Sequence, residues 1–320
     1  MQLGIPCLTS TDTARALAEI IESRFNEENT ELVDINHMRP WRQRIHFAKM
    51  QSCGNDYIFI ENFDGAVSCP ESLCISLCTP HYGIGGDGLV LIEHSRVADA
   101  KMRTFNQDGS EGRMAGNNIR SVAKYLFDKG YVHSTSMRIE TLSGIYRVRL
   151  YLRDGKANTV SVDMGCPTFE TARIPACSDL PEIIRAPFEA AGQNWEVTCV
   201  NVGNPHCVVF CDAIDSLDLA RIGPAFEEHP MFPERVNTEF VRVVNRTTLR
   251  IRVWERGNGE TLSCGTGACA AVAAAVRNGY CDRESDITVK LLGGDMTVRC
   301  GDTLSLSGVS TMVFEGEFEM

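Results

Sequence analysis

Short apolar runs separated by turn residues dominate the chain from residue 46 onward. Three of these runs, at 57–62, 88–94 and 101–106, have the length and the β-branched and aromatic content of strands. A Gly-rich turn follows, and residues 118–130 then carry apolar side chains at helical spacing and end at a glycine, which is typical of a helix end. Alternating strand patterns return at 136–152. The pattern predicts an α+β arrangement, with one helix beside many strands and a curled sheet around that central helix.

The same order of elements occurs a second time, at an offset of 149 residues that becomes 150 after the helix. Strand-like runs recur at 207–212, 239–244, 249–255 and 286–300, and the second helix is expected at 267–279. About a dozen matches in one register indicate two copies of one fold, at about 46–193 and 194–320. The matches are Gly54 and Asn55 with Gly203 and Asn204, Phe105 with Trp254, Glu111 with Glu260, Gly130 and Tyr131 with Gly279 and Tyr280, and Leu142, Gly144, Val148 and Arg149 with Leu292, Gly294, Val298 and Arg299.

An N-terminal extension, residues 1–45, precedes the first copy. It carries apolar residues at helical spacing behind Thr11, a residue type that caps helix starts. We expect one helix there. It would serve as an arm that binds a partner or forms a dimer, or as an extra helix packed on the domain, and we favour the packed helix.

Composition and charge narrow the class of protein. With 43% hydrophobic and 23% charged residues the chain is globular, and its formal charge of −11 argues against nucleic acid and anionic membranes as partners. The start of the chain lacks a signal-peptide pattern, and no apolar run has membrane-spanning length. The fourteen cysteines include no CxxC pair and no metal-ligand spacing, so we expect reduced thiols in a cytoplasmic protein. No phosphate loop or pyridoxal lysine motif is present either, and we therefore expect no cofactor and no metal.

The segment GETLSCGTGACAAVAAA, residues 259–275, places Cys264 at the start of the second helix. Backbone N–H groups and the helix dipole at such a start can stabilise a thiolate and hold a carboxylate. Gly265 and Gly267 allow a ligand to approach the backbone closely. A cysteine at this place could also be a packing residue, but the flanking glycines and the charged turn beside it favour a ligand site.

The first copy has the corresponding segment RMAGNNIR, residues 113–120, with Ala115 in the place of Cys264. If the two halves face each other, both helix starts converge on one cleft and hold one carboxylate between them. Groups at 115 and 264 would then lie on opposite sides of the adjacent carbon, as inversion of a stereocentre requires. The second copy adds Glu255 and Arg256, which can hold an ammonium and a carboxylate or can be a plain surface ion pair.

At this point six segments match a known family. The chain resembles diaminopimelate epimerase, the cofactor-independent amino-acid isomerase of lysine and peptidoglycan precursor synthesis, from about His46 to the C-terminus. Proline racemase and the PhzF-like isomerases share that fold but lack these segments. They are FAKMQSCGNDYIFIEN, HYGIGGDGLVLIE, FNQDGSEGRMAGNNIR, VGNPHCVVF, ERVNTEF and ERGNGETLSCGTGACAAVAA.

The resemblance implies two pseudo-symmetric domains, 46–160 plus 308–320 and 161–307, each a curled, mostly antiparallel sheet or barrel around a central helix. It also implies a small diamino acid as substrate and, in many members, a homodimer. Cys264 would be one of two catalytic thiols, and His206 and Glu255 would influence the pKa of the thiols. The residues that would bind substrate are Asn55, Asn106, Gly116, Asn117, Asn204, Asn237, Glu255, Arg256, Gly265 and Thr266.

Three departures from the family pattern lie at or near the site. Ala115 stands where members have the second catalytic cysteine, Cys53 where leucine is common, and Ser121 where a further cysteine is common. Ala115 is then an introduced substitution, or a natural one in which Cys53 or a water serves the second face, or the sign of a protein that binds a diamino acid without inverting it. We favour a natural variant, because three sites differ together. The main alternative function is a racemase of another amino acid.

Overall fold

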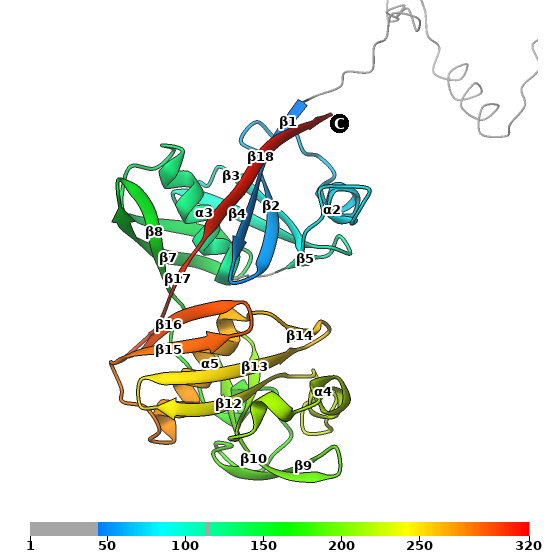
Figure 1. Cartoon of the computed structure of the whole chain (residues 1–320), viewed down its shortest axis with the longest axis vertical. Coiled ribbons are helices and arrows are strands. Elements are labelled where there is room, and N and C mark those ends of the chain that lie inside the picture. The colour runs from blue at the N-terminus through cyan, green and yellow to red at the C-terminus, as the bar shows by residue number, and fades with distance from the viewer. Residues whose placement is uncertain (1–43, 113–115, 320) are drawn as a thin grey trace, which may run out of the picture. The chain divides into compact units, whose positions relative to one another are not determined.

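The computed structural model describes residues 44–112 and 116–319 (Figure 1). Ile45–Phe318 form one compact unit. The second unit, Met1–Arg44 with Glu319–Met320, falls almost wholly outside the described residues, and so do the helix expected within 1–45 and position 115. No helix in the described part is long and apolar enough to cross a bilayer.

Between Arg44 and Asp163, the described residues of the first copy hold eight strands and two helices, in an order that follows the sequence pattern closely. Its elements are β1 (Arg44–Ser52), β2 (Asn55–Glu61), α2 (Pro70–Cys78), β3 (Gly88–Glu93), β4 (Ala100–Asn106), β5 (Glu111–Gly112), α3 (Gly116–Asp128), β6 (Ser136–Thr141), β7 (Gly144–Arg153) and β8 (Lys156–Asp163).

The second copy repeats this order and ends with two strands that return to the first copy. Its elements are η1 (Thr171–Arg173), β9 (Ala186–Ala190), β10 (Gln193–Asn201), β11 (Pro205–Phe210), η2 (Ile214–Ser216), α4 (Leu219–Glu227), β12 (Asn237–Asn245), β13 (Thr248–Glu255), β14 (Gly259–Thr261), α5 (Gly265–Arg277), β15 (Asp286–Leu291), β16 (Gly294–Cys300), β17 (Leu304–Val309) and β18 (Thr311–Glu319).

The internal repeat read from the sequence is present in the structure. Both ends of β1, α2 and α3 lie 149 residues before the ends of β10, α4 and α5, and both ends of β6 lie 150 residues before those of β15. The expectation of one helix per copy is wrong, because each copy has a second one, α2 or α4. Pro70 opens α2 at a position where its missing N–H costs nothing, and the Asp218 side chain caps α4 at the Arg221 N–H.

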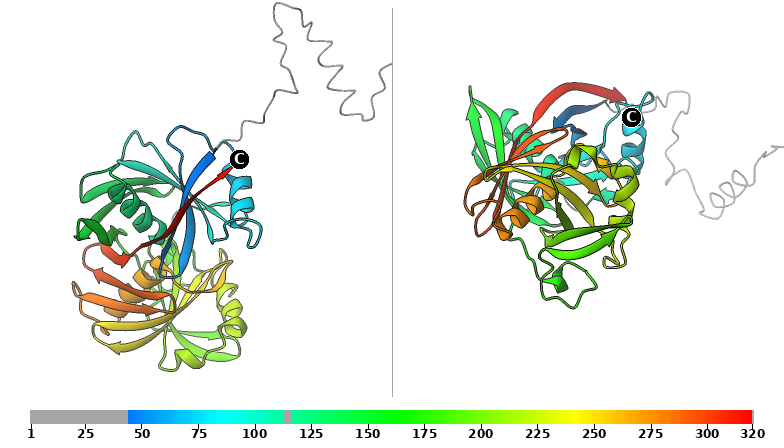
Figure 2. Two further views of the ribbon diagram at one scale, coloured as in Figure 1. Left: turned by 45° about the horizontal axis from the view of Figure 1, so that its top comes forward. Right: turned by 60° about the horizontal axis from the view of Figure 1, so that its bottom comes forward.

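All strands in the described residues join one continuous sheet that is mostly antiparallel, as the family resemblance implied. The parallel pairs come twice at equivalent places, β2 with β3 and β4 with β6 in the first copy, and β11 with β12 and β13 with β15 in the second. Strand β17 pairs with β16 on one side and with β8 on the other, and β18 pairs with β1. The last two strands therefore tie the second copy to the first (Figures 1 and 2).

Successive strand residues are buried on opposite faces because helices cover the sheet on both sides. In β2, Phe59 packs in the core cluster that contains α3, whereas Ile58 and Ile60 pack in the cluster that contains α2. Burial on both faces explains why these strands read as continuous apolar runs. The second copy has the same two layers, with α5 inside the curl and α4 outside it.

Helix α5 is the buried axis of the second copy, as its alanine-rich sequence predicts. Ala268, Cys269 and the alanines up to Ala275 are almost completely inaccessible, so small side chains let the surrounding strands approach on every side. The helix ends at Arg277 with Asn278 as its C-cap, and Gly279 follows with a positive φ of 80°, the left-handed conformation that glycine adopts at no steric cost.

Candidate active site at the paired helix starts

The starts of α3 and α5 lie against each other, as the repeat predicted. A Cβ atom built on Gly265 would lie 3.7 Å from the Cα atom of Gly116 and 3.6 Å from the Asn117 Oδ1 atom. It would also meet the end of the Leu306 side chain at 3.0 Å, so a larger residue at position 265 would require that side chain to shift. The backbone N–H groups at both helix starts are left without partners inside their own helices, and together they form a site suited to an anion.

Asn117 links the two halves by hydrogen bonds beside these helix starts. Its Nδ2 donates to Ser263 Oγ at 3.1 Å, the residue before Cys264, and to Asn55 Oδ1 at 3.4 Å. Asn55 in turn donates from its own Nδ2 to the Asp87 carboxylate at 2.7 Å. The amide planes of Asn55 and Asn117 are therefore fixed by neighbours before any ligand binds.

Cys264 is the N-cap residue of α5 and is 7% exposed. Its sulfur accepts a hydrogen bond from the Gly267 N–H at 3.3 Å and lies 3.4 Å from Thr266 Oγ1. Burial, followed by the negative charges of Glu255 and Glu239, nevertheless raises the pKa of this thiol well above its ordinary value. The Gly267 N–H acts in the direction expected of a helix start and lowers this pKa, but burial and the two carboxylates outweigh it.

His206 is fully buried and both of its ring nitrogens are engaged. Asn204 donates from Nδ2 to Thr266 Oγ1 at 3.5 Å, so its Oδ1 faces His206 Nε2 at 2.9 Å and accepts that nitrogen's proton. Nδ1 then shares a proton with Glu239 Oε1 at 2.7 Å. The ring therefore holds the Asn204 amide in place and is itself held by the Glu239 carboxyl group.

Glu239 is a residue that sequence reasoning missed. It is fully buried, its Oε2 atom has no partner in the described residues, and burial raises the pKa of its carboxyl. It lies two residues after Asn237 on β12, so both side chains project from the same face of the strand. An acidic residue inside the apolar run 239–244 was the available signal.

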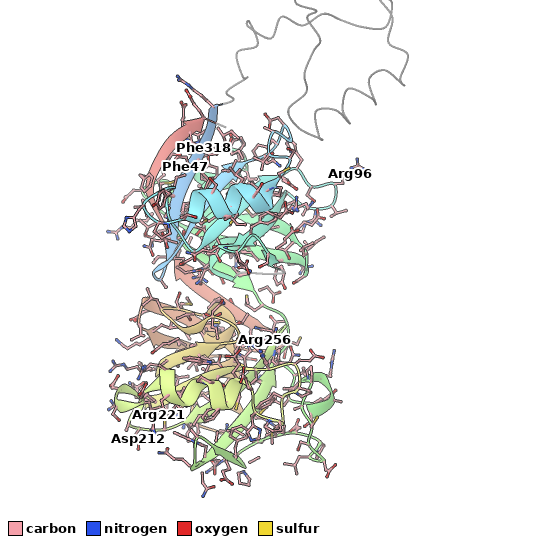
Figure 3. The ribbon with its side chains drawn as sticks, turned by 90° about the vertical axis from the view of Figure 1, so that its right-hand side faces the viewer. Phe47, Arg96, Asp212, Arg221, Arg256 and Phe318 are labelled. Atoms are coloured by element: carbon pink, nitrogen blue, oxygen red, sulfur yellow. The ribbon has the colours of Figure 1, made fainter. Side chains whose placement is uncertain are left out.

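The Glu255 and Arg256 pair sits at the end of β13, close to Asn237. The Glu255 carboxylate accepts a hydrogen bond from Thr261 Oγ1 at 2.5 Å, and burial raises its pKa. Asn237 Oδ1 accepts from the Arg256 backbone N–H at 2.9 Å, and the Arg256 guanidinium donates to the Glu234 carbonyl at 2.9 Å. Arg256 is labelled in Figure 3, on the second copy.

Asn106 and Cys53 make their hydrogen bonds outside this group of residues. The exposed Asn106 side chain donates to Ser110 Oγ at 3.0 Å, within its own turn. The Cys53 sulfur lies 3.8 Å from the Asp295 carbonyl, against the β15–β16 hairpin, and burial raises the pKa of its thiol.

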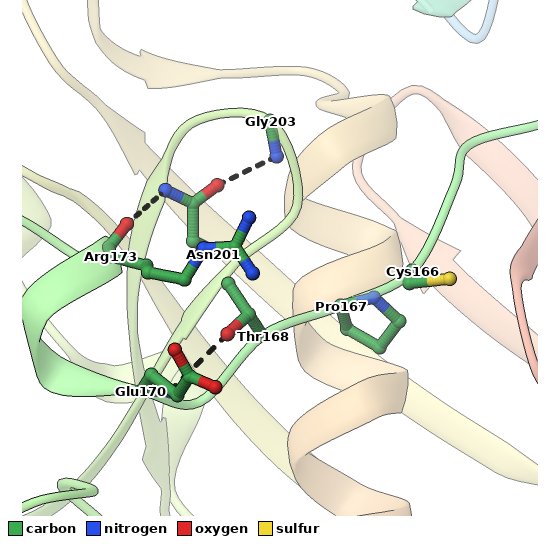
Figure 4. Close-up of a pocket in the computed structure, with 7 residues that line it drawn as sticks. All are labelled: Cys166, Pro167, Thr168, Glu170, Arg173, Asn201 and Gly203. Atoms are coloured by element: carbon green, nitrogen blue, oxygen red, sulfur yellow. Dashed lines mark hydrogen bonds between the residues drawn. The ribbon is translucent and has the colours of Figure 1, made fainter.

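A cavity of about 470 Å³ lies beside the segment that leads into the second copy (Figure 4). None of the site residues predicted from the sequence lines it. Two hydrogen bonds at its wall, from Asn201 Nδ2 to the Arg173 carbonyl at 2.6 Å and from the Gly203 N–H to Asn201 Oδ1 at 2.8 Å, fix the loop that carries Asn204. Its lining residues are Cys166, Pro167, Thr168, Glu170, Arg173, Asn201 and Gly203.

Comparison with solved structures supports the fold. A PhzF-family phenazine biosynthesis protein from Bacillus anthracis superposes with a TM-score of 0.64, at 16% identity, over 87% of this chain and 100% of that one. A hydroxyproline epimerase from Agrobacterium vitis superposes with a TM-score of 0.60, at 15% identity, over 88% of this chain and 94% of that one. The expected diaminopimelate epimerase-like fold is confirmed.

Sequence comparison is more specific. A diaminopimelate epimerase of Acetivibrio thermocellus is 49% identical over 280 residues, 86% of this chain and 99% of that protein. One from Desulfovibrio desulfuricans is 45% identical over 283 residues, 86% of this chain and 98% of that protein. The profile of the family described as diaminopimelate epimerase matches residues 47–170 and 198–312. The chain therefore belongs to the diaminopimelate epimerase family and is an isomerase.

Proposed function

We propose that the protein interconverts LL- and meso-diaminopimelate without a cofactor, by acid/base chemistry of the Cys264 thiol. The observation that carries this proposal is the contact between the starts of α3 and α5, with a buried thiol at one of them. A carboxylate held between two helix starts brings the adjacent C–H bond to the sulfur. The names of the most similar relatives supply the substrate.

The remaining site residues bind the two ends of the substrate. The N–H groups at the helix starts hold the α-carboxylate, and Glu255 holds the α-ammonium. Arg256 binds the distal carboxylate. His206, with Glu239, influences the charge at Cys264. The substrate-binding set is Asn55, Asn106, Gly116, Asn117, Asn204, Asn237, Glu255, Arg256, Gly265 and Thr266.

Substrate binding changes the charge around the thiol. In the free protein Glu255 is one of the groups that raise the pKa of Cys264. When the substrate ammonium pairs with Glu255, that negative charge is compensated. The pKa of the Cys264 thiol falls, and the thiolate forms more readily. The thiolate then takes the α-proton as the C–H electron pair passes to the carbon, and in the reverse direction the thiol returns a proton to the same face.

The opposite face of the α-carbon belongs to position 115, outside the described residues. Alanine cannot exchange a proton, so we expect one-sided or slow chemistry unless another group serves that face. Cys53 is retained as the candidate substitute base, although burial raises the pKa of its thiol and so lowers the thiolate fraction at neutral pH.

The test is exchange of the α-proton in deuterated water, followed by NMR separately for the LL and meso isomers. Exchange from one stereoisomer alone would mean that Cys264 acts from a single face. Inversion at an ordinary rate that is lost in Cys53→Ala would identify the substitute base. The proposal fails if Cys264→Ala retains full exchange, and Ala115→Cys should raise the inversion rate if a missing base is the only defect.

The proposal extends to the organisation of the protein. It includes domains at 46–160 plus 308–320 and 161–307, and pairing of β17 with β8 supports a crossing near residue 308. We also propose that the protein is a homodimer and acts in the cytoplasm. Sedimentation analysis of the purified protein would test the dimer directly.

A further inference from the structure

Arg120 is a buried charge without an acidic partner. Its side chain on α3 is fully inaccessible, and within the described part of the chain no carboxylate lies within ion-pair distance of it. Burial lowers its pKa to about 10, so the guanidinium is still charged at neutral pH. A buried, unpaired charge is costly and calls for a physical reason to retain it.

The Arg120 guanidinium packs against a glycine, Gly308. A Cβ atom on Gly308 of β17 would lie 3.2 Å from Arg120 Nε and 3.3 Å from Cζ, so the guanidinium lies directly on the glycine backbone. Its Nε atom has no hydrogen-bond partner in the described residues. Even a methyl group at position 308 would press on the charged group.

The hydrogen bonds of Arg120 lead to the candidate active site. Nη2 donates to Asn117 Oδ1 at 2.8 Å and to Ser52 Oγ at 2.7 Å, and Nη1 donates to the Gly116 carbonyl at 3.3 Å. Because the Asn117 oxygen is taken by Arg120, its Nδ2 must face Ser263 and the helix starts. The charge therefore lies about one helical turn behind the place where we expect the carboxylate.

We infer that Arg120 is a positioning residue for the carboxylate site, which fixes the Asn117 amide and adds a permanent positive charge behind both helix starts. This rests on and deepens the proposed function, because it names a group that selects a carboxylate over a neutral substituent at this place. The helix dipoles and a buried guanidinium then act on the anion in the same direction, in surroundings of low dielectric constant.

The test compares two alkylating reagents at Cys264, anionic iodoacetate and neutral iodoacetamide, by mass spectrometry of the peptide that carries this cysteine. The thiolate displaces iodide in both reactions, so the ratio of the two rates reports the electrostatic potential at the site and cancels changes in thiol pKa. In Arg120→Met we expect the ratio of iodoacetate to iodoacetamide rates to fall about tenfold. Arg120→Lys, which keeps the charge, should restore most of the ratio.

A matched control lies on the same helix. Ser121 is also buried. Its Oγ bonds to Ser310 Oγ at 2.7 Å and to the Asn117 backbone carbonyl at 3.5 Å but not to the Asn117 amide, and Ser121→Ala should leave the ratio unchanged. If Arg120→Met does not fold, Gly308→Ala gives the second measurement, because its methyl group displaces the guanidinium without removing it and should lower the ratio about twofold to threefold. An unchanged ratio in a folded Arg120→Met or in Gly308→Ala overturns the inference, as does an Arg120→Lys ratio as low as that of the Met variant.

These measurements use the free protein and no diamino acid. A wild-type protein that neither exchanges nor binds diaminopimelate would refute the proposed function and leave the reagent ratio to decide the role of Arg120. Where exchange is observed, Arg120→Met should raise KM for meso-diaminopimelate more than it lowers kcat, because the residue acts on carboxylate binding. A loss confined to kcat would contradict the inference.

Discussion

Cys264 shows how burial and helix polarity compete at one residue. The Gly267 N–H and the Thr266 hydroxyl lower the pKa of the thiol, whereas burial and two carboxylates raise it, and the second group prevails. In the free protein Cys264 is therefore a thiol rather than a thiolate. In the proposed mechanism, this thiol would donate the proton in one direction of the reaction, and the other direction would begin after the substrate has changed the local charge.

Removal of the Glu255 charge should make Cys264 more reactive. Since this carboxylate raises the pKa of the thiol, Glu255→Gln lowers that pKa and increases the thiolate fraction at any pH below it. We expect iodoacetamide to alkylate Cys264 roughly fivefold faster at pH 8 in this variant. The rate profile against pH should also shift to lower pH.

Glu260 provides the matched control for that experiment. It lies on β14 near Glu255 but pairs with Arg252, so Glu260→Gln should leave the alkylation profile of Cys264 unchanged. An unchanged profile in Glu255→Gln would contradict the charge balance described for the thiol.

Single residues of the site were predictable to different degrees. Cys264 and the paired glycines follow from the repeat, because an offset of 149 residues places two similar turns at two helix starts. Glu239 was missed because it acts through His206, which comes from another strand. Arg120 was missed because its burial depends on Ser52 and Gly308, which come from distant segments. Such pairings depend on which strands and helices become neighbours, and local patterns carry no record of that.

At the scale of elements, the β15–β16 hairpin of the second copy packs against the β1–β2 turn of the first. A Cβ atom on Gly293 would lie 1.9 Å from the Cys53 carbonyl oxygen, a contact that only a backbone shift could relieve. The equivalent position of the first copy is occupied by Ser143, so the hairpin itself does not require glycine. Glycine is required at position 293 because the two halves approach each other closely there.

Gly293→Ala should therefore loosen the contact between the halves. We expect a loss of about 3 kcal/mol in the free energy of unfolding, from the displacement of well-packed backbone. Urea denaturation monitored by fluorescence would measure it. Ser143→Ala is the control and should change stability by less than about 0.5 kcal/mol, and equal effects of the two substitutions would refute the argument.

The second helix of each copy was missed because the apolar pattern of the strands, which signals cover on both faces, was not recognised as a sign of a second helix layer. The run at 57–62 is apolar at every position from Tyr57 to Ile60, which signals cover on both faces rather than on one. One central helix can cover only the inner face. Helices α2 and α4 supply the outer cover, and their positions obey the same offset of 149 residues as the rest of the repeat.

For the whole molecule, the last two strands pair with strands of the first half, and β17 pairs with β16 of the second half as well. β18 pairs with β1, and Phe47 of β1 contacts the rings of Phe314 and Phe318 at centroid distances of 5.9 and 6.2 Å. Phe47 and Phe318 are seen together in Figure 3. The two copies were predictable from the repeat, and the return of the last strand was implied by the family resemblance. The parallel pairs were not, because sequence periodicity gives the faces of a strand and not the direction of its neighbour.

Deletion of residues 311–320 should destabilise the first half more than the second. The loss of the β18 backbone pairing and of the aromatic contacts of Phe47 should cost more than about 3 kcal/mol. Hydrogen exchange measured by mass spectrometry should show faster exchange in β1 and β2, with α5 still protected. Val313→Ser keeps the backbone pairing and serves as the control, and uniform exchange across the chain would contradict this account.

The return of β17 and β18 also sets the order of events during synthesis. The first half emerges from the ribosome early, but β1 and β8 each lack one neighbour until β17 and β18 have been translated. Its open edges must stay free of other chains for the whole time that the second half is being translated. Translation that stops before β17 would thus release chains with two unpaired strand edges, which chaperones would have to bind.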